Sequence, residues 1–315
     1  MYLLTYRPGG ARITPSDPLV KGDTQLTTAP MTHSIEPIRR FRAKSFDFGY
    51  DYEVQIALPI GYDESDTDYP VLWVMDGGLY FHLAASVAQL LAQGGRSPHF
   101  IVVGVGHDRR GPAQPWIERR MVDFFPMEDV AIDSIGNVEY WTALQGGRAK
   151  EFLSFLVDEL RPALAAEFRM RPDRHTLSGT SGGGYFATYA MLTRPDTFAG
   201  YLAASCPFNL GHGGIFEIES DYAATHADLE AKVYFTAGTS EVLDPGAADL
   251  DLVASTLHMA TTLQLRRYPS LEIQCQLSTE LDHWGIPIDL YKEGLPKVWG
   301  SEAGRAFIPS VADES

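Results

Sequence analysis

The sequence predicts an α/β fold with a mostly parallel central β-sheet and helices on both of its faces. Short continuous apolar runs alternate along the chain with segments of helical spacing, a pattern typical of parallel strands that are buried on both sides. A length of 315 residues, 45% of them hydrophobic, is enough for one large domain with a sizeable core. We expect that domain at about 36–299, with an extended arm at 1–35 and a loose tail at 300–315.

The expected strands begin at 50–58, where apolar and polar residues alternate with period two, as in a strand with one face exposed to solvent. The other strands are short, largely apolar segments at 70–75, 100–105, 199–204 and 232–237, one that ends at Leu177, and a last strand at 271–277. The expected helices lie at about 80–92, from 146 onward, 184–193, 247–263 and 287–295. Two long segments, 107–145 and 206–228, show no clear periodicity. Long loops in a compact domain usually serve function, so we expect both beside a site.

The composition excludes several classes of function. The formal net charge of −16 disfavours nucleic acid and anionic membranes as partners, because both require a basic surface. Cys206 and Cys275 are the only cysteines, too few for a disulfide framework or a zinc cluster. The N-terminus lacks the pattern of a signal peptide, and no apolar run is long enough to cross a membrane. The sequence therefore favours a cytoplasmic protein.

The segment from Gly179 to Gly183 has the pattern Gly-x-Ser-x-Gly, with Ser181 at its centre. This pattern is typical of a sharp strand-to-helix turn that raises a serine hydroxyl above the edge of a sheet. The glycines let the incoming strand and the outgoing helix pass close together. An apolar run ends just before the motif and a helical pattern opens just after it. We predict that Ser181 is a nucleophile; the alternative is a glycine-rich turn with a purely structural role.

A serine hydroxyl is a poor nucleophile unless an imidazole takes its proton and a carboxylate orients that imidazole. In a parallel α/β sheet such groups gather beyond the carboxyl ends of the strands. His283 follows the last expected strand and Glu241 follows the strand before it, which gives the chain order serine, acid, histidine. Asp244 competes for the role of acid, but it precedes Pro245 and is typical of a turn. We predict His283 as the general base and Glu241 as the acid, with the other eight histidines in surface or structural roles.

An oxyanion requires two backbone N–H groups that point at one spot. One is expected from Gly182, directly after the nucleophile, and the other from Gly78, in the loop after an earlier strand. The alternative for the segment Asp76-Gly77-Gly78 is a simple turn at a strand end. Large side chains in the loops are candidates for an apolar substrate pocket, or else for anchoring those loops. They are Leu79, Trp116, Phe124, Phe125, Trp141, His212 and Trp284.

Taken together, these segments resemble the esterase-D-like branch of the α/β-hydrolases, and more closely the esterases that include the enterobactin and salmochelin trilactone esterases. The matching motifs between about Ser45 and Leu295 include Leu58-Pro59-x-Gly61-Tyr62, Tyr69-Pro70-Val71-Leu72-x-x-x-Asp76-Gly77, Val103-Gly104-Val105-Gly106, Arg120-x-x-Asp123-x-x-Pro126, Phe152-Leu153-x-Phe155-Leu156 and Ser178-Gly179-x-Ser181-x-Gly183-Gly184. The resemblance implies an α/β-hydrolase fold with two active-site loop segments, and the site roles given above for Ser181, Glu241, His283, Gly78 and Gly182. It also implies that Arg120 and Asp123 brace an active-site loop; their alternative is an exposed charge pair. Trp284 departs from the family pattern, in which a small residue often follows the histidine.

The combined prediction is a serine esterase that acts through an acyl-enzyme on a small or medium-sized ester. Neither a metal nor an organic cofactor is implied, and the expected partner is the small-molecule substrate. The same triad would also serve an acyltransferase or an amidase, and a catalytically silent binding protein of the same fold is the alternative from another class. The sequence is compatible with a homo-oligomer.

Overall fold

A computed structural model describes residues 38–44, 51–107, 113–127, 146–244 and 250–300. All of them belong to one compact unit that spans 35–315. The expected arm at 1–35 and the tail at 300–315 lie outside the described residues, apart from Gly300. None of the described helices is long and apolar enough to cross a membrane.

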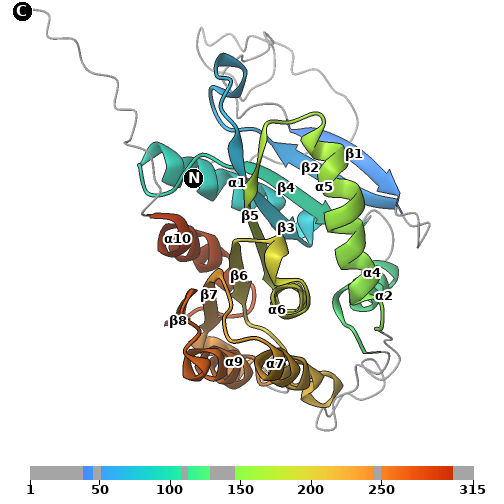
Figure 1. Ribbon diagram of the computed structural model, residues 1–315, viewed down its shortest axis with the longest axis vertical. Helices are drawn as coiled ribbons and strands as arrows, with labels where there is room; N and C mark the ends of the chain where they lie inside the picture. Colours follow the sequence, from blue (N-terminus) through green and yellow to red (C-terminus); the bar gives the residue numbers. More distant parts are fainter. Residues whose placement is uncertain (1–37, 45–50, 108–112, 128–145, 245–249, 301–315) are drawn as a thin grey trace, which may run out of the picture. The chain divides into compact units, whose positions relative to one another are not determined.

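The described part of the chain forms one eight-stranded sheet with the order β1-β2-β4-β3-β5-β6-β7-β8 (Figure 1). Strands β1 (Arg39–Lys44) and β2 (Asp51–Ala57) form an antiparallel edge. The other six strands are parallel to one another. They are β3 (Tyr69–Met75), β4 (Ile101–Gly106), β5 (Met170–Thr180), β6 (Gly200–Ala204), β7 (Ala231–Gly238) and β8 (Leu271–Ser278). The expected α/β class with a mostly parallel sheet is therefore confirmed.

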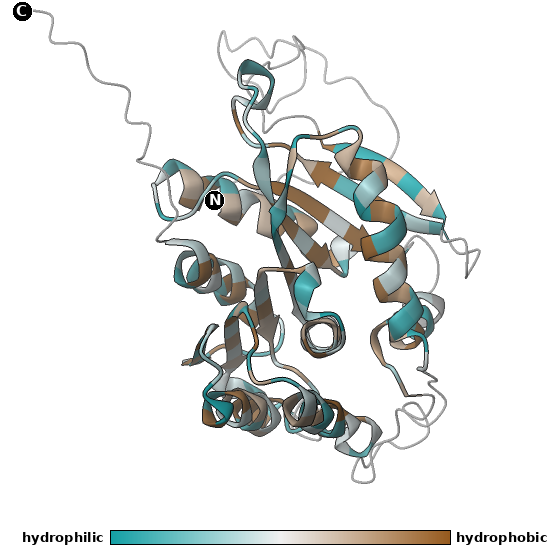
Figure 2. Ribbon diagram, in the orientation of Figure 1, coloured by the Kyte–Doolittle hydropathy of each residue, from teal (hydrophilic) through white to brown (hydrophobic). Residues whose placement is uncertain are grey.

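Helices cover both faces of the sheet, and the core is divided accordingly into two apolar clusters (Figures 1 and 2). Side chains alternate between the clusters along each buried strand: Trp73 belongs to one and Leu72 to the other. Helices α1 (Gly77–Gln93) and α10 (Ile286–Trp299) cover one face. The elements on the other face are α2 (Ala113–Phe124), α4 (Ala149–Ser154), a π-helical turn (Phe155–Leu160), α5 (Arg161–Ala165), α6 (Gly182–Thr193), α7 (Gly214–Thr225) and α9 (Leu252–Arg266).

Two of these helices lie in segments that we expected to be irregular. Helix α2 falls inside 107–145 and α7 inside 206–228, so the prediction of loops was wrong for these parts; residues 128–145 lie outside the described residues. In α7 the buried positions are Ile215, Glu219 and Tyr222, at helical spacing. The middle position is a carboxylate, which is buried because Arg266 pairs with both of its oxygens. The apolar pattern is therefore interrupted by an ion pair.

Candidate active site

The predicted nucleophile lies on a sharp turn between a strand and a helix. Ser181 follows β5 and precedes α6, with φ 58° and ψ −127°. Glycine is required on both sides of the turn. A Cβ atom on Gly179 would lie 2.2 Å from the backbone carbon of Gly183, and one on Gly184 would lie 2.6 Å from Sγ of Cys206. The sequence motif thus folds into the expected strand–turn–helix geometry, with the serine side chain at the edge of the sheet.

Ser181 is one of three non-glycine residues with positive φ that follow adjacent parallel strands. Asp76 follows β3 with φ 54°, and Ser205 follows β6 with φ 49°. Positive φ is costly for residues with a Cβ, and such strain persists where surrounding contacts impose it, commonly at functional sites. All three residues stand at the carboxyl edge of the sheet, the place where α/β proteins bind their ligands.

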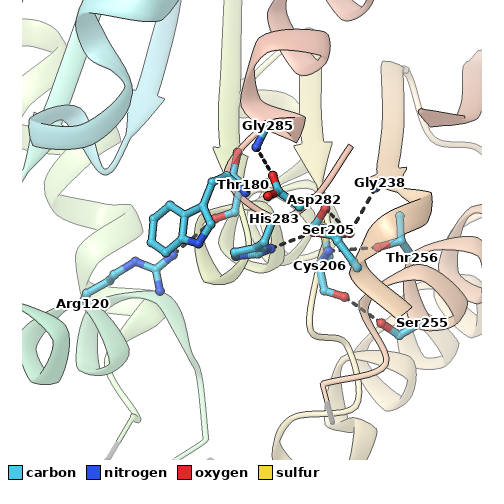
Figure 3. Close-up of polar contacts among 12 residues, drawn as sticks. Arg120, Thr180, Ser205, Cys206, Gly238, Ser255, Thr256, Asp282, His283 and Gly285 are labelled. Atoms are coloured by element: carbon cyan, nitrogen blue, oxygen red, sulfur yellow. Dashed lines mark hydrogen bonds and ion pairs between the residues drawn. The ribbon is translucent and has the colours of Figure 1, made fainter. Parts of the chain in front are cut away.

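The candidate acid and base are in direct contact at the same edge. Nδ1 of His283 lies 2.7 Å from Oε1 of Glu241. The second carboxylate oxygen, Oε2, accepts hydrogen bonds from the Ser205 hydroxyl at 2.8 Å and from the Gly238 N–H at 3.1 Å (Figure 3). Glu241 is 1% exposed, so these three donors replace water around a buried carboxylate. Of the two carboxylates considered from the sequence, Glu241 is the one that contacts the imidazole, whereas Asp244 donates its N–H to the Glu241 carbonyl.

A short chain of hydrogen bonds connects this pair to the turn that carries Ser181. The Ser181 N–H donates to the Ala204 carbonyl at 2.8 Å. The next residue after Ala204 is Ser205, whose hydroxyl holds Glu241. The loop after β8 is tied to the segment after β7, because the Ser240 N–H donates to the Leu281 carbonyl at 3.0 Å. The structure therefore gathers the serine, the acid and the histidine at the carboxyl ends of β5, β7 and β8.

Arg120 connects the loop after β3 to the same turn. Its Nε donates to the Asp76 carboxylate, 2.8 and 2.9 Å from the two oxygens. Its Nη2 donates to the Thr180 carbonyl at 3.3 Å (Figure 3). Asp76 directly precedes Gly77 and Gly78 at the start of α1, and Thr180 directly precedes Ser181. The guanidinium also lies against the other predicted oxyanion donor, because a Cβ on Gly182 would be 3.0 Å from its Nη1. One side chain thus spans both segments predicted to bind an oxyanion.

Arg120 and Asp123 do not form the exposed charge pair that was one of the two alternatives for them. Arg120 pairs with Asp76, and Asp123 is fully buried. Oδ2 of Asp123 accepts a hydrogen bond from the Tyr52 hydroxyl at 3.0 Å and lies 2.6 Å from Nε2 of His107. Asp123 therefore fixes α2 to the core, and α2 carries Arg120 to the edge of the sheet.

The residues predicted to line a pocket differ in their burial. Phe124 and Phe125 are 1% and 0% exposed and belong to the core, so the prediction that Phe124 contacts substrate was wrong. Leu79 in α1 and Trp116 in α2 are half-buried, and His212 is exposed in the turn before α7. Trp284 is 72% exposed, and its ring packs edge-on against His283 with 6.1 Å between centroids. Trp141 lies outside the described residues.

Buried polar groups near the sheet have structural partners. His175 accepts the Trp73 indole N–H at its Nδ1, at 3.0 Å, and burial lowers the pKa of His175 to about 3, so the ring stays neutral. Cys206 is fully buried, and burial raises the pKa of its thiol. Cys275 is half-buried, and both cysteines are free. No group of three or more His, Cys, Asp or Glu side chains within the described segments has a geometry that would hold a metal ion.

Sequence reasoning missed two residues of this site, Ser205 and Asp76. Both follow buried strands directly, the criterion that selected Ser181, Glu241 and His283. Applied to every strand end, the same criterion would have found them.

Comparison with curated proteins finds relatives that match part of this chain. The siderophore triacetylfusarinine C esterase of Aspergillus fumigatus is 30% identical over 167 residues, which are 50% of this chain and 52% of the relative. The ferri-bacillibactin esterase BesA of Bacillus subtilis is 27% identical over 144 residues, 44% of this chain and 47% of the relative. The chain thus spans about half the length of the curated relatives it matches.

Solved structures agree with the fold. An IroE-like serine hydrolase from Shewanella oneidensis has a TM-score of 0.69 and 25% identity, with 82% of this chain and 79% of that chain covered. The BES protein from Bacillus cereus has a TM-score of 0.70 and 22% identity, with 88% and 99% covered, and shows the fold alone. The family model described as "Putative esterase" matches residues 45–241, more than half of the chain. The chain therefore belongs to this esterase family.

Proposed function

We propose that the protein is a serine hydrolase of carboxylic esters that works through an acyl-enzyme. The observation that carries the proposal is the Glu241–His283 contact of 2.7 Å, tied through Ser205 to the turn that bears Ser181. A buried carboxylate on Nδ1 keeps the proton on that nitrogen and leaves Nε2 of His283 as an acceptor. An acceptor imidazole is what a serine hydroxyl requires to become a nucleophile.

The reaction follows from these roles. Oγ of Ser181 attacks the ester carbonyl while Nε2 of His283 takes its proton, and the N–H groups of Gly78 and Gly182 receive the oxyanion. His283 then returns the proton to the departing alcohol, which leaves an acyl group on Ser181. Water attacks the acyl-enzyme with the same histidine as base, releases the carboxylic acid and restores the serine. Arg120 supports this cycle by holding the two oxyanion segments together through Asp76 and Thr180.

The relatives suggest where to look for the natural substrate. The two curated relatives are named as esterases, one of the siderophore triacetylfusarinine C and one of ferri-bacillibactin. We propose siderophore esters as the first substrate class for this chain. Triacetylfusarinine C and bacillibactin, each with and without iron, would be incubated with the protein and followed by mass spectrometry. Hydrolysis adds the elements of water for each ester bond broken, whereas transfer to an added alcohol does not.

The chemistry itself is tested by covalent labelling. A fluorophosphonate is expected to modify the folded wild-type protein at Ser181, because only an activated serine hydroxyl reacts readily with it. Peptide mapping by mass spectrometry locates the adduct, and Ser181→Ala is the control that removes it. Absence of labelling in folded wild-type protein would refute the proposed function and favour a silent binding protein.

Ser205 provides a test of how the acid is held. Ser205→Ala removes one of two donors to Oε2 of Glu241 and is expected to lower kcat/KM by about 10- to 100-fold, the range for a hydrogen bond to a charged group. Ser205→Gly is the matched variant, because glycine adopts φ 49° without strain but also lacks the hydroxyl. We expect both variants to lose activity. If Ser205→Gly kept the wild-type kcat/KM, the hydroxyl of Ser205 would not be needed to hold Glu241, and only the backbone conformation at this position would be.

A further inference from the structure

Exposed apolar side chains occur directly beside the proposed acid and base. Val242 and Leu243 follow Glu241 and are 57% and 81% exposed, and Trp284 follows His283 and is 72% exposed. We call these three residues the apolar rim. Leu243 and Trp284 have the highest exposures among the large hydrophobic residues that the structure describes. An apolar side chain that stays in water does not gain the favourable free energy of burial. Exposed apolar side chains that lie together commonly mark a binding surface.

The backbone of the rim is fixed by hydrogen bonds. Oδ1 of Asp282 accepts the N–H groups of Trp284 at 3.1 Å and Gly285 at 2.8 Å, and so shapes the turn that begins α10 (Figure 3). On the other side, the Glu280 N–H donates to Oγ1 of Thr239 at 3.0 Å. The segments that carry Leu243 and Trp284 are therefore joined to each other close to the ends of β7 and β8.

The position of the rim indicates which part of an ester it would contact. In the proposed reaction His283 gives its proton to the oxygen of the departing alcohol, so the alcohol lies on the histidine side of the scissile bond. The Trp284 ring packs against the His283 ring with an interplanar angle of 79°. A group attached to that oxygen would thus meet Trp284 first.

The charge around the rim disfavours an anionic group. Glu280 and Asp282 are exposed carboxylates in the same turn as Trp284. The guanidinium of Arg120, at the edge of the neighbouring strands, already pairs with Asp76. A negatively charged alcohol would therefore face like charge at close range, which opposes binding.

From these observations we propose that the apolar rim of Val242, Leu243 and Trp284 binds the part of the alcohol nearest the ester oxygen and favours an apolar, uncharged group there. The inference rests on the proposed function, because it assigns a specificity element to that same site. An aromatic alcohol fits best, since an exposed indole offers a flat face for stacking.

The probes are acetate esters that share one acyl group and differ in the alcohol: ethyl acetate, 4-methylbenzyl acetate and 4-carboxybenzyl acetate. The two benzyl alcohols differ mainly in charge. Because kcat/KM covers the steps through departure of the alcohol, it reports on this portion of the substrate. We expect the wild-type protein to prefer 4-methylbenzyl acetate over 4-carboxybenzyl acetate by about 10-fold or more, the discrimination typical of an apolar contact surface.

Two rim variants test the assignment. Trp284→Ala is expected to lower the ratio of kcat/KM for 4-methylbenzyl acetate to that for ethyl acetate by about 10-fold, chiefly through KM. Leu243→Lys is expected to raise kcat/KM for 4-carboxybenzyl acetate relative to kcat/KM for 4-methylbenzyl acetate, because the lysine places a cation at the rim. Leu265 on α9 is 71% exposed, and Leu265→Lys is the matched control, with ratios expected to match the wild type.

The outcomes separate the two proposals. If the wild-type protein reacts with a fluorophosphonate and hydrolyses the esters, but Trp284→Ala and Leu243→Lys keep the wild-type ratios, the role of the rim is refuted and the proposed function stands. If Leu265→Lys shifts the ratios as much as Leu243→Lys does, the effect is one of overall charge, and the rim assignment is again refuted. If a fluorophosphonate does not label Ser181 in the folded wild-type protein, the proposed function is refuted, and the role of the rim with it.

Discussion

Replacing Ser181 with alanine is expected to lower kcat/KM for activated esters by about 10⁵- to 10⁶-fold, as removal of the nucleophile does in other serine hydrolases. The physical reason is that alanine lacks the hydroxyl that Ser181 places on the turn between β5 and α6, and that hydroxyl is the nucleophile of the proposed reaction. Alanine meets the same φ of 58° as serine does, so the backbone strain is unchanged and the fold should be retained. The measurement is hydrolysis of p-nitrophenyl butyrate at substrate concentrations well below KM.

The matched control for this prediction is Ser240→Ala. Ser240 is a half-buried serine just after β7, at the carboxyl edge of the sheet. It donates a hydrogen bond to the Leu281 carbonyl through its backbone N–H, which the substitution leaves in place. We expect Ser240→Ala to keep kcat/KM within a few-fold of the wild type. Circular dichroism and Tm establish that both variants are folded. A folded Ser181→Ala protein with wild-type turnover would show that another residue is the nucleophile.

The strand pattern could be predicted from the sequence because the central parallel strands are buried on both faces, whereas the edge strand β8 alternates between half-buried and exposed residues. Burial on both faces removes polar residues from a segment such as Val71–Met75, and the resulting apolar run differs plainly from its surroundings. The strand ends in turn indicate the site: Glu241 and His283 were selected by their position after β7 and β8, and the structure brings them into contact. Local pattern and chain order were sufficient for both inferences.

The contacts missed from the sequence depend on pairings between distant segments. Arg120 and Asp123 are three residues apart and on one helix, yet their partners are Asp76, His107 and Tyr52, which come from three other segments. Sequence spacing cannot show which of several carboxylates a guanidinium will reach. For the same reason Phe124 was predicted to line a substrate pocket: only the packing of α2 against α4 and α6 shows that its ring stacks on Phe186 in the core.

The strained residues at the strand ends have a common explanation. Asp76, Ser181 and Ser205 each turn the chain sharply out of a strand, and each contributes a group to the edge of the sheet. Asp76 accepts the Arg120 hydrogen bond, and Ser205 donates to Glu241. A relaxed backbone would carry these side chains away from the edge. The strain is therefore maintained by the same contacts that order the site.

Glu241→Gln is expected to lower kcat by about 10⁴-fold, the size of effect known when a triad carboxylate is replaced by its amide. The structure supplies a specific reason. Oε2 accepts two hydrogen bonds, from Ser205 and from the Gly238 N–H, so the amide of glutamine must place its oxygen there. Its NH₂ group then faces Nδ1 of His283, which has to accept a hydrogen bond instead of donating one. The proton moves to Nε2, and the imidazole can no longer take the proton of Ser181.

Two further variants make this prediction specific to Glu241. Asp244→Asn should retain most of the activity, because the Glu241 carboxylate is the one that contacts His283. In the double variant Glu241→Gln/Ser205→Ala, the Ser205 hydroxyl is gone, and of the two donors that the described residues place at the Oε2 position the Gly238 N–H remains. The glutamine amide is then less strongly oriented and can turn its oxygen toward Nδ1, so we expect part of the lost kcat to return. Equal kcat in the single and double variants would contradict the tautomer argument, and a larger loss in Asp244→Asn than in Glu241→Gln would overturn the assignment of the acid.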